Sequence, residues 1–514
     1  MLTTSAASPL IHLHASDNVG VARARIPTGT AVIFDGVGVT ALAEIPSGHK
    51  MAVAPIPAGS RVLKYGQTIG VATTDIAPGA HVHLHNLAMQ ESDVAHHFAE
   101  DGRATELLPE AERRTFEGYV RPDGQVGTRN YIGIVTSVNC SATVARAVAD
   151  HFNRGGGLEG FANVDGVVAL THGTGCAINT KTEGYAYLTR VLGGYAKNPN
   201  FAGILMIGLG CETNQIEPIV SREGLVEGHL LRTMTIQGLG GTRKTIETAS
   251  AIVREMLPIA DAAKRTTVPL TGLKVALQCG GSDGYSGISA NPALGHAADL
   301  VVRHGGTAVL SETPEIYGAE HLLTRRAVSP EVAQKLMDRI DWWRSYTERN
   351  GAELNNNPSH GNKAGGLTTI LEKSLGAVAK GGSMPLEAVY EYAEIIDRTG
   401  FVFMDTPGYD PVAVTGQVAG GCNVVVFTTG RGSVSGFKPA PCIKVATNTQ
   451  MYLHMHEDMD INCGGIVTGE DTIAAAGERI FEKILAVASG AHTASEDYGF
   501  GDSEFVPWQI GAVT

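Results

Sequence analysis

The chain has 514 residues, more than one hydrophobic core usually supports, so we expect two or three domains. Hydrophobic residues make up 43% of it and charged residues 18%, the composition of an ordinary globular protein. Its net charge of -13 argues against nucleic acid as a partner, because nucleic acids select basic surfaces.

A four-residue turn phrase recurs along residues 1–90. It reads Ile-Pro-Thr-Gly at 26–29, Ile-Pro-Ser-Gly at 45–48, Ile-Pro-Ala-Gly at 56–59 and Ile-Ala-Pro-Gly at 76–79. Proline presets φ for a turn and glycine tolerates positive φ, so each phrase should reverse the chain between two short strands. We therefore predict a small all-β domain over residues 1–90, with strands at 51–54, 62–63 and 68–72.

The same domain is rich in histidine, a residue that suits iron, zinc or manganese sites. His14 and His49 both sit at predicted turns and are candidate metal ligands. His81, His83 and His85 alternate along one predicted strand and so share one face of it. For His81 and His83 we slightly favour a solvated polar strand face over a metal site.

Residues 91–117 are polar and charged and are predicted to form a linker. From residue 118 onward, strand patterns alternate with helical patterns, which indicates an α/β region with a mainly parallel sheet. A polar break near residues 260–270 divides this region into two predicted subdomains, 118–265 and 266–514. Helices are expected at 141–152, 292–303 and 330–350.

Four short apolar runs of the α/β region each lead to a cysteine in a small, often glycine-rich segment: Cys140, Cys176, Cys211 and Cys279. Each run is typical of a buried parallel strand, and ligands bind at the edge where the carboxyl ends of such strands meet. Four thiols at that edge suggest a reaction centre for a soft or redox-sensitive metal. The alternative, a small buried hydrophobic residue, explains any single cysteine equally well but all four together less well.

Polar residues in glycine-rich segments form a second group of candidates. His172 shares a loop with Cys176, and the segment NNNPSHGNKAGG at 355–366 is predicted to be a functional loop without regular structure. A single arginine in a loop usually serves a salt bridge. Several cations in glycine-rich segments are better explained by a carboxylate substrate, and these are Arg129, Lys363, Arg431 and Lys444.

Several common classes of protein are not supported by the sequence. It has no phosphate-binding loop, and the Gly208-Leu209-Gly210 segment lacks the third glycine of a dinucleotide fingerprint. No apolar stretch approaches 18 residues and the N-terminus does not read as a signal peptide, so we expect no membrane association. An odd number of widely spaced cysteines, seven, predicts a cytoplasmic protein with reduced thiols.

Long and unusual strings in this chain resemble those of the altronate and galactarate dehydratase family. They include HASDNV, IPSGHK and VLKYGQTIG near the N-terminus, and GTRN, HGTGC, IGLGCE, QCGGSDGYSGISANPALG, NPSHGNKAGG, FTTGRGS and MDIN further on. The resemblance covers nearly the whole length. It implies an N-terminal SAF-type β-clip domain followed by a large, mainly parallel α/β catalytic region.

The resemblance also implies an activity. The family removes water from a hexonate or hexarate to give a 2-keto-3-deoxy acid, and it uses a divalent metal, typically iron(II) or manganese. D-altronate is the favoured substrate, with galactarate dehydratase and sulfolactate sulfo-lyase as alternatives. A non-catalytic sugar-acid-binding protein is the alternative from another class, although no DNA-binding element accompanies it.

Residue roles follow as hypotheses. Proton transfer from and to the substrate is assigned first to His172 and second to Lys363. The candidate substrate-binding residues are Arg129, Asn130, Asp283, Asn362, Arg431 and Lys444.

Two metal centres remain open. Mononuclear iron or manganese on His14 and His49 is favoured over an iron–sulfur cluster on Cys140, Cys176, Cys211 and Cys279, because no Cys-x-x-Cys occurs. A homodimer is expected, as for most soluble metabolic enzymes.

Overall fold

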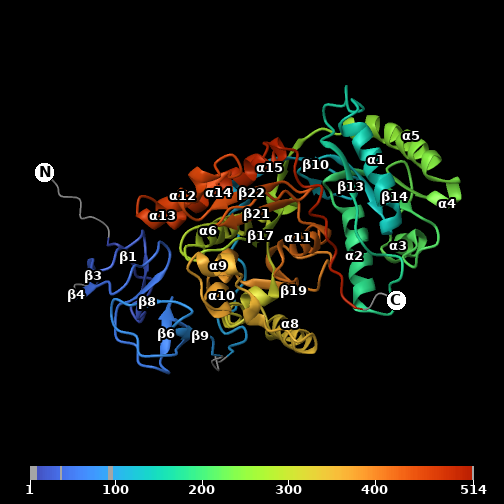
Figure 1. The fold of residues 1–514 in the computed structure, drawn as a ribbon. Helices are drawn as coiled ribbons and strands as arrows, with labels where there is room; N and C mark the ends of the chain where they lie inside the picture. The colour runs from blue at the N-terminus through green and yellow to red at the C-terminus, as the bar shows by residue number, and fades with distance from the viewer. Residues whose placement is uncertain (1–7, 35–36, 91–95, 512–514) are drawn as a thin grey trace.

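The computed structural model describes residues 8–34, 37–90 and 96–511. We call residues 8–90 the N-terminal domain, 118–265 the middle domain and 266–511 the C-terminal domain. The N-terminal and middle domains lie at opposite ends of the molecule, with the C-terminal domain between them (Figure 1). Within the described ranges, no helix combines the length and the apolar character that crossing a membrane requires.

The N-terminal domain is all β, as predicted. Its strands are β1 (Leu10–Ile11), β2 (Val19–Ala22), β3 (Ala31–Phe34), β4 (Val37–Thr40), β5 (Lys50–Ala52), β6 (Arg61–Lys64), β7 (Gln67–Ala72), β8 (His81–Val82) and β9 (Leu87–Ala88). The turn phrases pair with one another through isolated bridges, Ile26 with Ile45 and Ile56 with Ile76. All four phrase glycines have φ between 78° and 88°, which confirms the predicted turns.

The segment that connects the N-terminal domain to the α/β region has little regular structure. The first residues of the predicted linker, 91–95, lie outside the described ranges. Its end already belongs to β10 (Thr115–Val120), which pairs with β11 (Val126–Gly127) and with β16 (Thr266–Pro269). This small sheet therefore joins the start of the middle domain to the start of the C-terminal domain.

The middle domain has a parallel sheet in the order β13-β12-β14-β15. Its strands are β12 (Tyr131–Thr136), β13 (Gly166–Leu170), β14 (Phe201–Gly208) and β15 (Leu231–Thr235). Its helices are α1 (Ala142–Asn153), α2 (Glu183–Lys197), α3 (Ile216–Arg222), α4 (Ile236–Leu239) and α5 (Thr242–Asp261). The chain adds β13 on one side of β12 and β14 on the other, so the strand order reverses at β12.

The C-terminal domain has a seven-stranded parallel sheet in the order β19-β20-β18-β17-β21-β22-β23. The strands are β17 (Lys274–Cys279), β18 (Thr307–Leu310), β19 (Leu386–Tyr390), β20 (Gly400–Met404), β21 (Val424–Thr429), β22 (Cys442–Ala446) and β23 (Ile461–Asn462). The strand order reverses at β17, which has β18 on one side and β21 on the other. The crevice beyond the carboxyl ends of such strands is the usual ligand site in an open α/β sheet.

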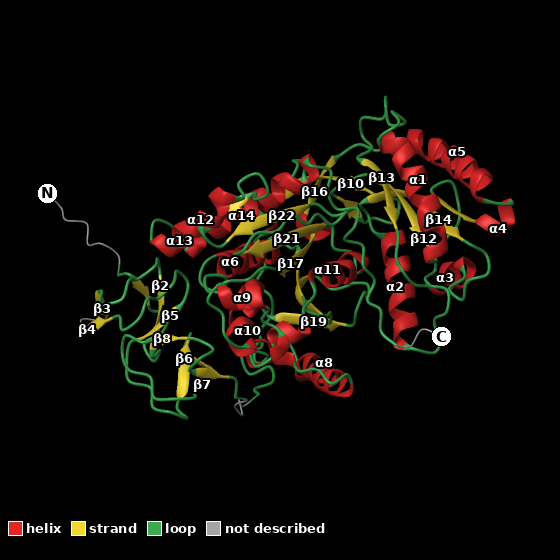
Figure 2. Cartoon of the chain, in the orientation of Figure 1, coloured by secondary structure: helices red, strands yellow, loops and turns green. Residues whose placement is uncertain are grey.

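Helices cover both faces of this sheet (Figure 2). They are α6 (Ala290–Arg303), α7 (His321–Thr324), α8 (Pro330–Arg349), α9 (His360–Ala364), α10 (Ile370–Val378), α11 (Asp410–Ala419), α12 (Thr449–His454), α13 (Gly464–Thr468), α14 (Ile473–Ala488) and α15 (Ala494–Asp497). Alternate residues of β17 separate the two cores: Val275 and Leu277 pack with α6 and α14, and Ala276 packs with α11. The second core also includes residues of α2, so the middle domain helps to bury the C-terminal sheet.

The final segment of the described chain returns to the middle domain. Its Trp508 ring stacks on Trp343 of α8 at a centroid distance of 5.3 Å and on Tyr187 of α2 at 5.2 Å. Trp508 thus links helices of the two α/β domains through buried aromatic contacts.

Candidate active site

An open pocket of about 460 Å³ lies beyond the carboxyl ends of β17 and β21, at the point where the strand order reverses. The N-terminal domain forms part of its wall through Ser47. The remaining lining comes from loops and short helices of the C-terminal domain: Asp283, Tyr285, Ala364, Gly365, Gly430, Arg431, Asn448, Gln450, Met451, His454 and Met455. The position matches the crevice in which open α/β sheets bind ligands.

Asp283 is the buried carboxylate of this pocket. It accepts hydrogen bonds from Thr447 Oγ1 at 3.0 Å and Asn448 Nδ2 at 3.1 Å, and from Ser286 Oγ and the Tyr285 amide. Burial raises the pKa of its carboxyl, although these hydrogen bonds oppose the shift. Asp283 thus fixes the loops after β17 and β22 to each other at the floor of the pocket.

The pocket also contains exposed groups that are free to meet a ligand. Arg431 follows β21, and its backbone amide donates to the Gly281 carbonyl at 2.9 Å, so its side chain emerges from a fixed turn. His454 ends α12, is exposed and also lines the pocket. An arginine and an imidazole in one pocket provide a carboxylate-binding group and a proton-transfer group.

The N-terminal domain docks onto the segment 359–372 beside this pocket. The Nε2 atoms of His49 and His83 lie 3.2 Å from the Ala364 carbonyl oxygen and 2.9 Å from the Lys363 carbonyl oxygen, respectively. The approach is close, because a Cβ atom at Gly366 would lie 2.4 Å from the Gly48 carbonyl oxygen. Glycine is therefore required at 366, where φ is also positive at 104°.

A buried ion triplet strengthens this docking. Glu372 of α10 lies 2.9 Å from the ammonium group of Lys50 and 2.9 Å from that of Lys64, and all three side chains are almost fully buried. Burial raises the pKa of Glu372, but the two lysines outweigh it and hold this pKa well below its usual range. The N-terminal domain therefore contributes two buried positive charges to a carboxylate of the C-terminal domain.

Four histidines cluster at the same interface. The His49 ring lies 5.1 Å from that of His81 and 5.0 Å from that of His83, and His85 lies 5.5 Å from His81. Only His81 belongs to a strand; the chain then turns around Asn86, so the predicted single strand face does not form. Burial, followed by the neighbouring imidazoles or Lys50, lowers the pKa of His81 to about 3 and that of His83 to about 4.

This histidine cluster has the donor chemistry of a metal site. His49 Nδ1 and His81 Nε2 are 3.0 Å apart and share a hydrogen bond, so a metal ion that bound both nitrogens would displace the proton between them. Because the Nε2 atom of His49 donates to a backbone carbonyl, its Nδ1 atom carries the lone pair. Neutral imidazole is the form that binds metal. His14, in contrast, bonds to Ser16 and packs against Gly66, so the structure does not bring it into this cluster.

A second group of side chains that can bind metals lies near the pocket, at the end of β17. Donor atoms of Cys279, Glu312 and Glu315 all lie within 4.8 Å of one another and are buried. Two lysines already occupy this space: Lys380 Nζ is 3.0 Å from the Cys279 sulfur and Lys373 Nζ is 2.6 Å from a Glu315 oxygen. These ammonium groups take the place that a cation would need, so the arrangement does not support the predicted metal role of Cys279.

The same cluster holds strongly shifted groups. Burial, together with the negative charge of Glu315, raises the pKa of Glu312 to about 8 and that of Asp410 to about 7. Burial also raises the pKa of the Cys279 thiol to about 12. Glu312 adopts a left-handed backbone conformation with φ at 71°, an uncommon and strained state for a residue other than glycine. Shifted carboxyls and backbone strain together are typical of functional sites.

Several predicted site residues serve the fold instead. Arg129 is buried, forms an ion pair with Glu496 and donates to three backbone carbonyls, so the structure does not support a substrate clamp there. Asn130 bonds to Arg121 and to two backbone carbonyls. His172 lies in the middle domain, with Nε2 at 2.9 Å from the Thr136 carbonyl oxygen and Nδ1 accepting from the Thr174 amide. Both its ring nitrogens are therefore occupied.

The remaining predicted residues surround the pocket in different ways. The segment 355–366 does contain regular structure, contrary to prediction, because Ser359 and Asn362 form a capping box that starts α9. Asn362 also donates to the Ser282 carbonyl and so positions the loop before Asp283. Lys363, beside it, has no ion-pair partner within the described ranges. Lys444 is buried in β22 and donates to the Ser435 carbonyl at 3.2 Å.

The four cysteines singled out by the sequence do not meet at one sheet edge. Cys140, Cys176 and Cys211 follow strands of the middle domain and are exposed, whereas Cys279 ends a strand of the C-terminal domain and is buried. The apolar runs are parallel strands, as predicted, but they belong to two separate sheets. The expectation that the four strands share one sheet edge is therefore wrong.

The sequence patterns missed much of the buried cluster and of the docking interface. Glu312 closely follows the apolar run at 306–310, and a carboxylate just after a strand-like run is the signal that could have included it. Lys380, Lys373 and Glu372 come from helices whose pattern reads as ordinary amphipathic sequence, so only the tertiary structure identifies them. His454 lies at the end of a short helix that no strong pattern marks.

A family model described as "D-galactarate/Altronate dehydratase, C-terminal" matches residues 270–513, and a second described as "D-galactarate dehydratase/Altronate hydrolase, second domain" matches 118–261. A third, the "Altronate/galactarate dehydratase SAF domain", matches residues 8–90. Together these models cover the three domains of the structure.

Curated relatives align over most of the chain. A galactarate dehydratase (L-threo-forming) of Escherichia coli strain K12 is 38% identical over 504 residues, 95% of this chain and 94% of the relative. An altronate dehydratase of Bacillus subtilis strain 168 is 35% identical over 480 residues, which are 93% of this chain and 95% of the relative. The beta subunit of a (2R)-sulfolactate sulfo-lyase of Chromohalobacter salexigens is 32% identical over 405 residues, which are 77% of this chain and 98% of the relative.

Proposed function

Because the chain belongs to the D-galactarate/altronate dehydratase family, we propose that it is a sugar-acid dehydratase. It removes water from D-altronate, or from a related aldonate or aldarate, and forms a 2-keto-3-deoxy acid. The observation that supports this most is the pocket between the N-terminal and C-terminal domains, where Arg431 and His454 line one cavity with the buried Asp283.

The reaction removes the proton next to a carboxylate and expels the hydroxyl of the following carbon. Arg431 binds the substrate carboxylate, because its guanidinium group can donate two parallel hydrogen bonds to it. His454 and Lys363 are the proton-transfer candidates beside the pocket, one to take the α-proton and one to protonate the leaving hydroxyl. Asp283 acts as a positioning residue, since its oxygens already accept from neighbours that frame the cavity.

We further propose iron(II) or manganese as the cofactor, held by His49 and His81 with His83 beside them. The site adjoins the pocket because His49 donates to Ala364, which itself lines the cavity. When bound, the ion supplies positive charge for the negative charge that develops on the substrate carboxylate. An iron–sulfur cluster is the less favoured cofactor for this reaction. The expected cytoplasmic homodimer stays a prediction that sedimentation velocity and cell fractionation test.

The test is anaerobic incubation of iron(II)-loaded protein with D-altronate, galactarate, glucarate and sulfolactate. Formation of a 2-keto-3-deoxy acid from one sugar acid supports the proposal and identifies the substrate. Galactarate is included because the galactarate dehydratase of E. coli is 38% identical to this chain. Sulfite release from sulfolactate would replace dehydration with sulfo-lyase activity, and binding without turnover would overturn the enzyme assignment.

A further inference from the structure

The middle domain has its own site at the point where its strand order reverses. Cys140 follows β12, Cys176 follows β13 and Cys211 follows β14, so three neighbouring strands each deliver one thiol to the same edge. The other four cysteines of the chain are buried, and these three are exposed. Exposed free thiols are open to oxidation, so three of them gathered at one ligand-binding edge call for a functional explanation.

Backbone hydrogen bonds join the three thiol-bearing loops directly. The amide of Asn139 donates to the Thr174 carbonyl at 3.0 Å, linking the first loop to the second. The amide of Thr213 donates to the carbonyl of Cys176 itself at 3.1 Å, linking the third loop to the second. Each cysteine therefore lies within two residues of a backbone contact to a neighbouring cysteine loop.

The glycine before Cys176 makes this close packing possible. Gly175 has φ at 104°, and a Cβ atom there would lie 2.3 Å from the Ser137 carbonyl oxygen of the loop after β12. Any other residue would push the Cys140 and Cys176 loops apart. The same contact region includes Asn214, whose amide donates to the Gly175 carbonyl at 3.0 Å.

A buried carboxylate fixes the third loop. Glu212 accepts hydrogen bonds from Ser137 Oγ at 2.6 Å and from the Gly210 amide at 2.6 Å, and so connects the loops after β12 and β14. Next to Glu212, Gln237 Nε2 donates to the Cys211 sulfur at 3.3 Å and so fixes the position of this sulfur.

The spacing of the thiols selects the kind of ligand. Among the described residues, the sulfurs of Cys140, Cys176 and Cys211 do not all lie within 4.8 Å of one another, as the ligands of a single ion would. A polynuclear cluster separates its thiolates by the iron and sulfide atoms between them. We propose that Cys140, Cys176 and Cys211 hold an iron–sulfur cluster that leaves one iron without a protein thiolate.

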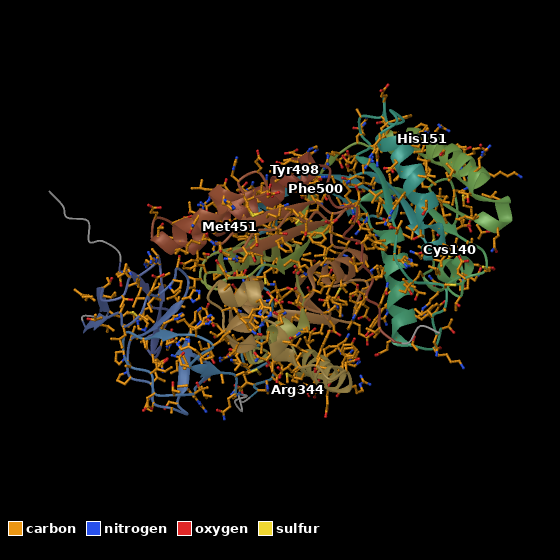
Figure 3. The ribbon with its side chains drawn as sticks, in the orientation of Figure 1. Cys140, His151, Arg344, Met451, Tyr498 and Phe500 are labelled. Carbon is orange, nitrogen blue, oxygen red and sulfur yellow. The ribbon has the colours of Figure 1, made fainter. Side chains whose placement is uncertain are left out.

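This site is separate from the one proposed for dehydration. Cys140 lies in the middle domain and Met451, which lines the active-site pocket, lies in the C-terminal domain; the two are far apart in the view of Figure 3. The cluster proposal rests on the loops of the middle domain alone. The proposal therefore does not depend on which sugar acid is turned over or on the metal proposed at His49.

The experiment is anaerobic reconstitution of the full chain with iron salts, sodium sulfide and excess thiol, followed by desalting. The expected result is about four iron ions and four acid-labile sulfide ions per chain, with an absorption band at about 400 nm. The variant C140S/C176S/C211S should lose the sulfide and the band while keeping its circular dichroism spectrum. The single variant Cys463→Ala, which alters a buried cysteine away from the loops, should keep both.

Three outcomes would overturn the proposal. One is wild-type protein that incorporates no labile sulfide. Another is a triple variant that retains as much sulfide as the wild type. The third is stoichiometric zinc binding that depends on the same three cysteines without any sulfide, which would make the site a zinc centre. If the triple variant fails to fold, the single variants Cys140→Ser, Cys176→Ser and Cys211→Ser are measured instead, each expected to reduce the sulfide content at least severalfold.

Discussion

The Nδ1 atom of His49 lies 3.0 Å from the Nε2 atom of His81, where the N-terminal domain meets the C-terminal end of α9. The backbone carbonyl of Ala364 accepts from the other nitrogen of His49 and so fixes the tautomer that directs a lone pair toward His81. Burial lowers the pKa of both imidazoles and keeps them neutral near pH 7. His81 Nε2 therefore donates to His49 Nδ1, and a metal ion that bound both nitrogens would replace this hydrogen bond.

We therefore expect His49→Ala and His81→Ala each to weaken iron(II) or manganese binding at least about tenfold, since a ligand is lost. Equilibrium dialysis with metal analysis measures this. His14→Ala is the matched control: His14 is in the same domain but bonds to Ser16, and its loss should leave affinity unchanged. Equal affinity in all three variants would locate the metal elsewhere.

Arg431 should determine the affinity for the substrate. Arg431→Ala is expected to raise KM about ten- to hundredfold, because a hydrogen-bonded charge pair contributes roughly 1.5–3 kcal/mol. Arg431→Lys should restore only part of this, since an ammonium group cannot form the two parallel hydrogen bonds. Steady-state kinetics on the substrate found in the panel measures the effect. Arg243→Ala, an exposed arginine of α5, is the control, and an unchanged KM for Arg431→Ala would contradict this role.

The domain interface should weaken in acid. The pKa of Glu372 is lower in the folded than in the unfolded chain, so the unfolded state takes up its proton first as the pH falls. Its contribution is complete above about pH 5, and it is lost as the pH falls through the folded pKa. Glu372→Gln should flatten the dependence of the urea midpoint on pH between 3 and 7.

At pH 7, the same variant leaves Lys50 and Lys64 buried without a counter-charge. The expected loss of unfolding free energy is roughly 3–5 kcal/mol, as for other broken buried ion pairs. Glu348→Gln, an exposed change on α8, should have no such effect at any pH. A pH profile of Glu372→Gln that parallels the wild type would show that Glu372 is not the titrating group.

The sequence predicted the elements of this fold better than their assembly. The turns at Gly29, Gly48, Gly59 and Gly79 and the strand before each of the four cysteines follow from local rules: glycine at positive φ and apolar runs of strand length. Which strands share a sheet is not a local property. That is why Cys279 was grouped with three thiols of another domain.

Residue roles depended on tertiary partners in the same way. Arg129 stands in a glycine-containing segment that resembles a ligand-binding turn, yet Glu496, 367 residues later, binds its guanidinium group. Asp283 stands out as a candidate in the sequence because its motif is unusual and lies just after a strand. Glu372 and Lys380 escaped notice because a buried charge on a helix has no sequence pattern that separates it from a solvated one.

The buried cluster around Cys279 should be sensitive to loss of a single charge. Lys380→Met removes the ammonium group that lies 3.1 Å from Glu312. Because the pKa of Glu312 is about 8, the lost counter-charge matters above pH 8, where we expect a loss of roughly 3–5 kcal/mol. Adding Glu312→Gln should recover part of the loss, because the uncompensated charge is gone. Urea unfolding of both variants measures this. A double variant no more stable than Lys380→Met would contradict direct pairing.

The stacked Trp508 should matter to the stability of both α/β domains. Its ring lies between Trp343 and Tyr187 at interplanar angles of 4° and 10°, and it is 7% exposed. Trp508→Ala should therefore cost roughly 3–5 kcal/mol, the usual cost of removing a buried large aromatic ring. Because the ring links α8 to α2, calorimetry should also show the middle-domain transition separating from that of the C-terminal domain.

The control for this prediction is another stacked aromatic residue near the C-terminus. Tyr498 packs on Phe500 at 5.4 Å, but these rings are 48% and 45% exposed and both come from one short segment. Figure 3 shows them together at the surface. Tyr498→Ala should change stability by no more than about 0.5 kcal/mol, as is usual for surface positions. If Trp508→Ala has an equally small effect, its stacking does not couple the two domains, and the contacts between α2 and α11 must hold them together instead.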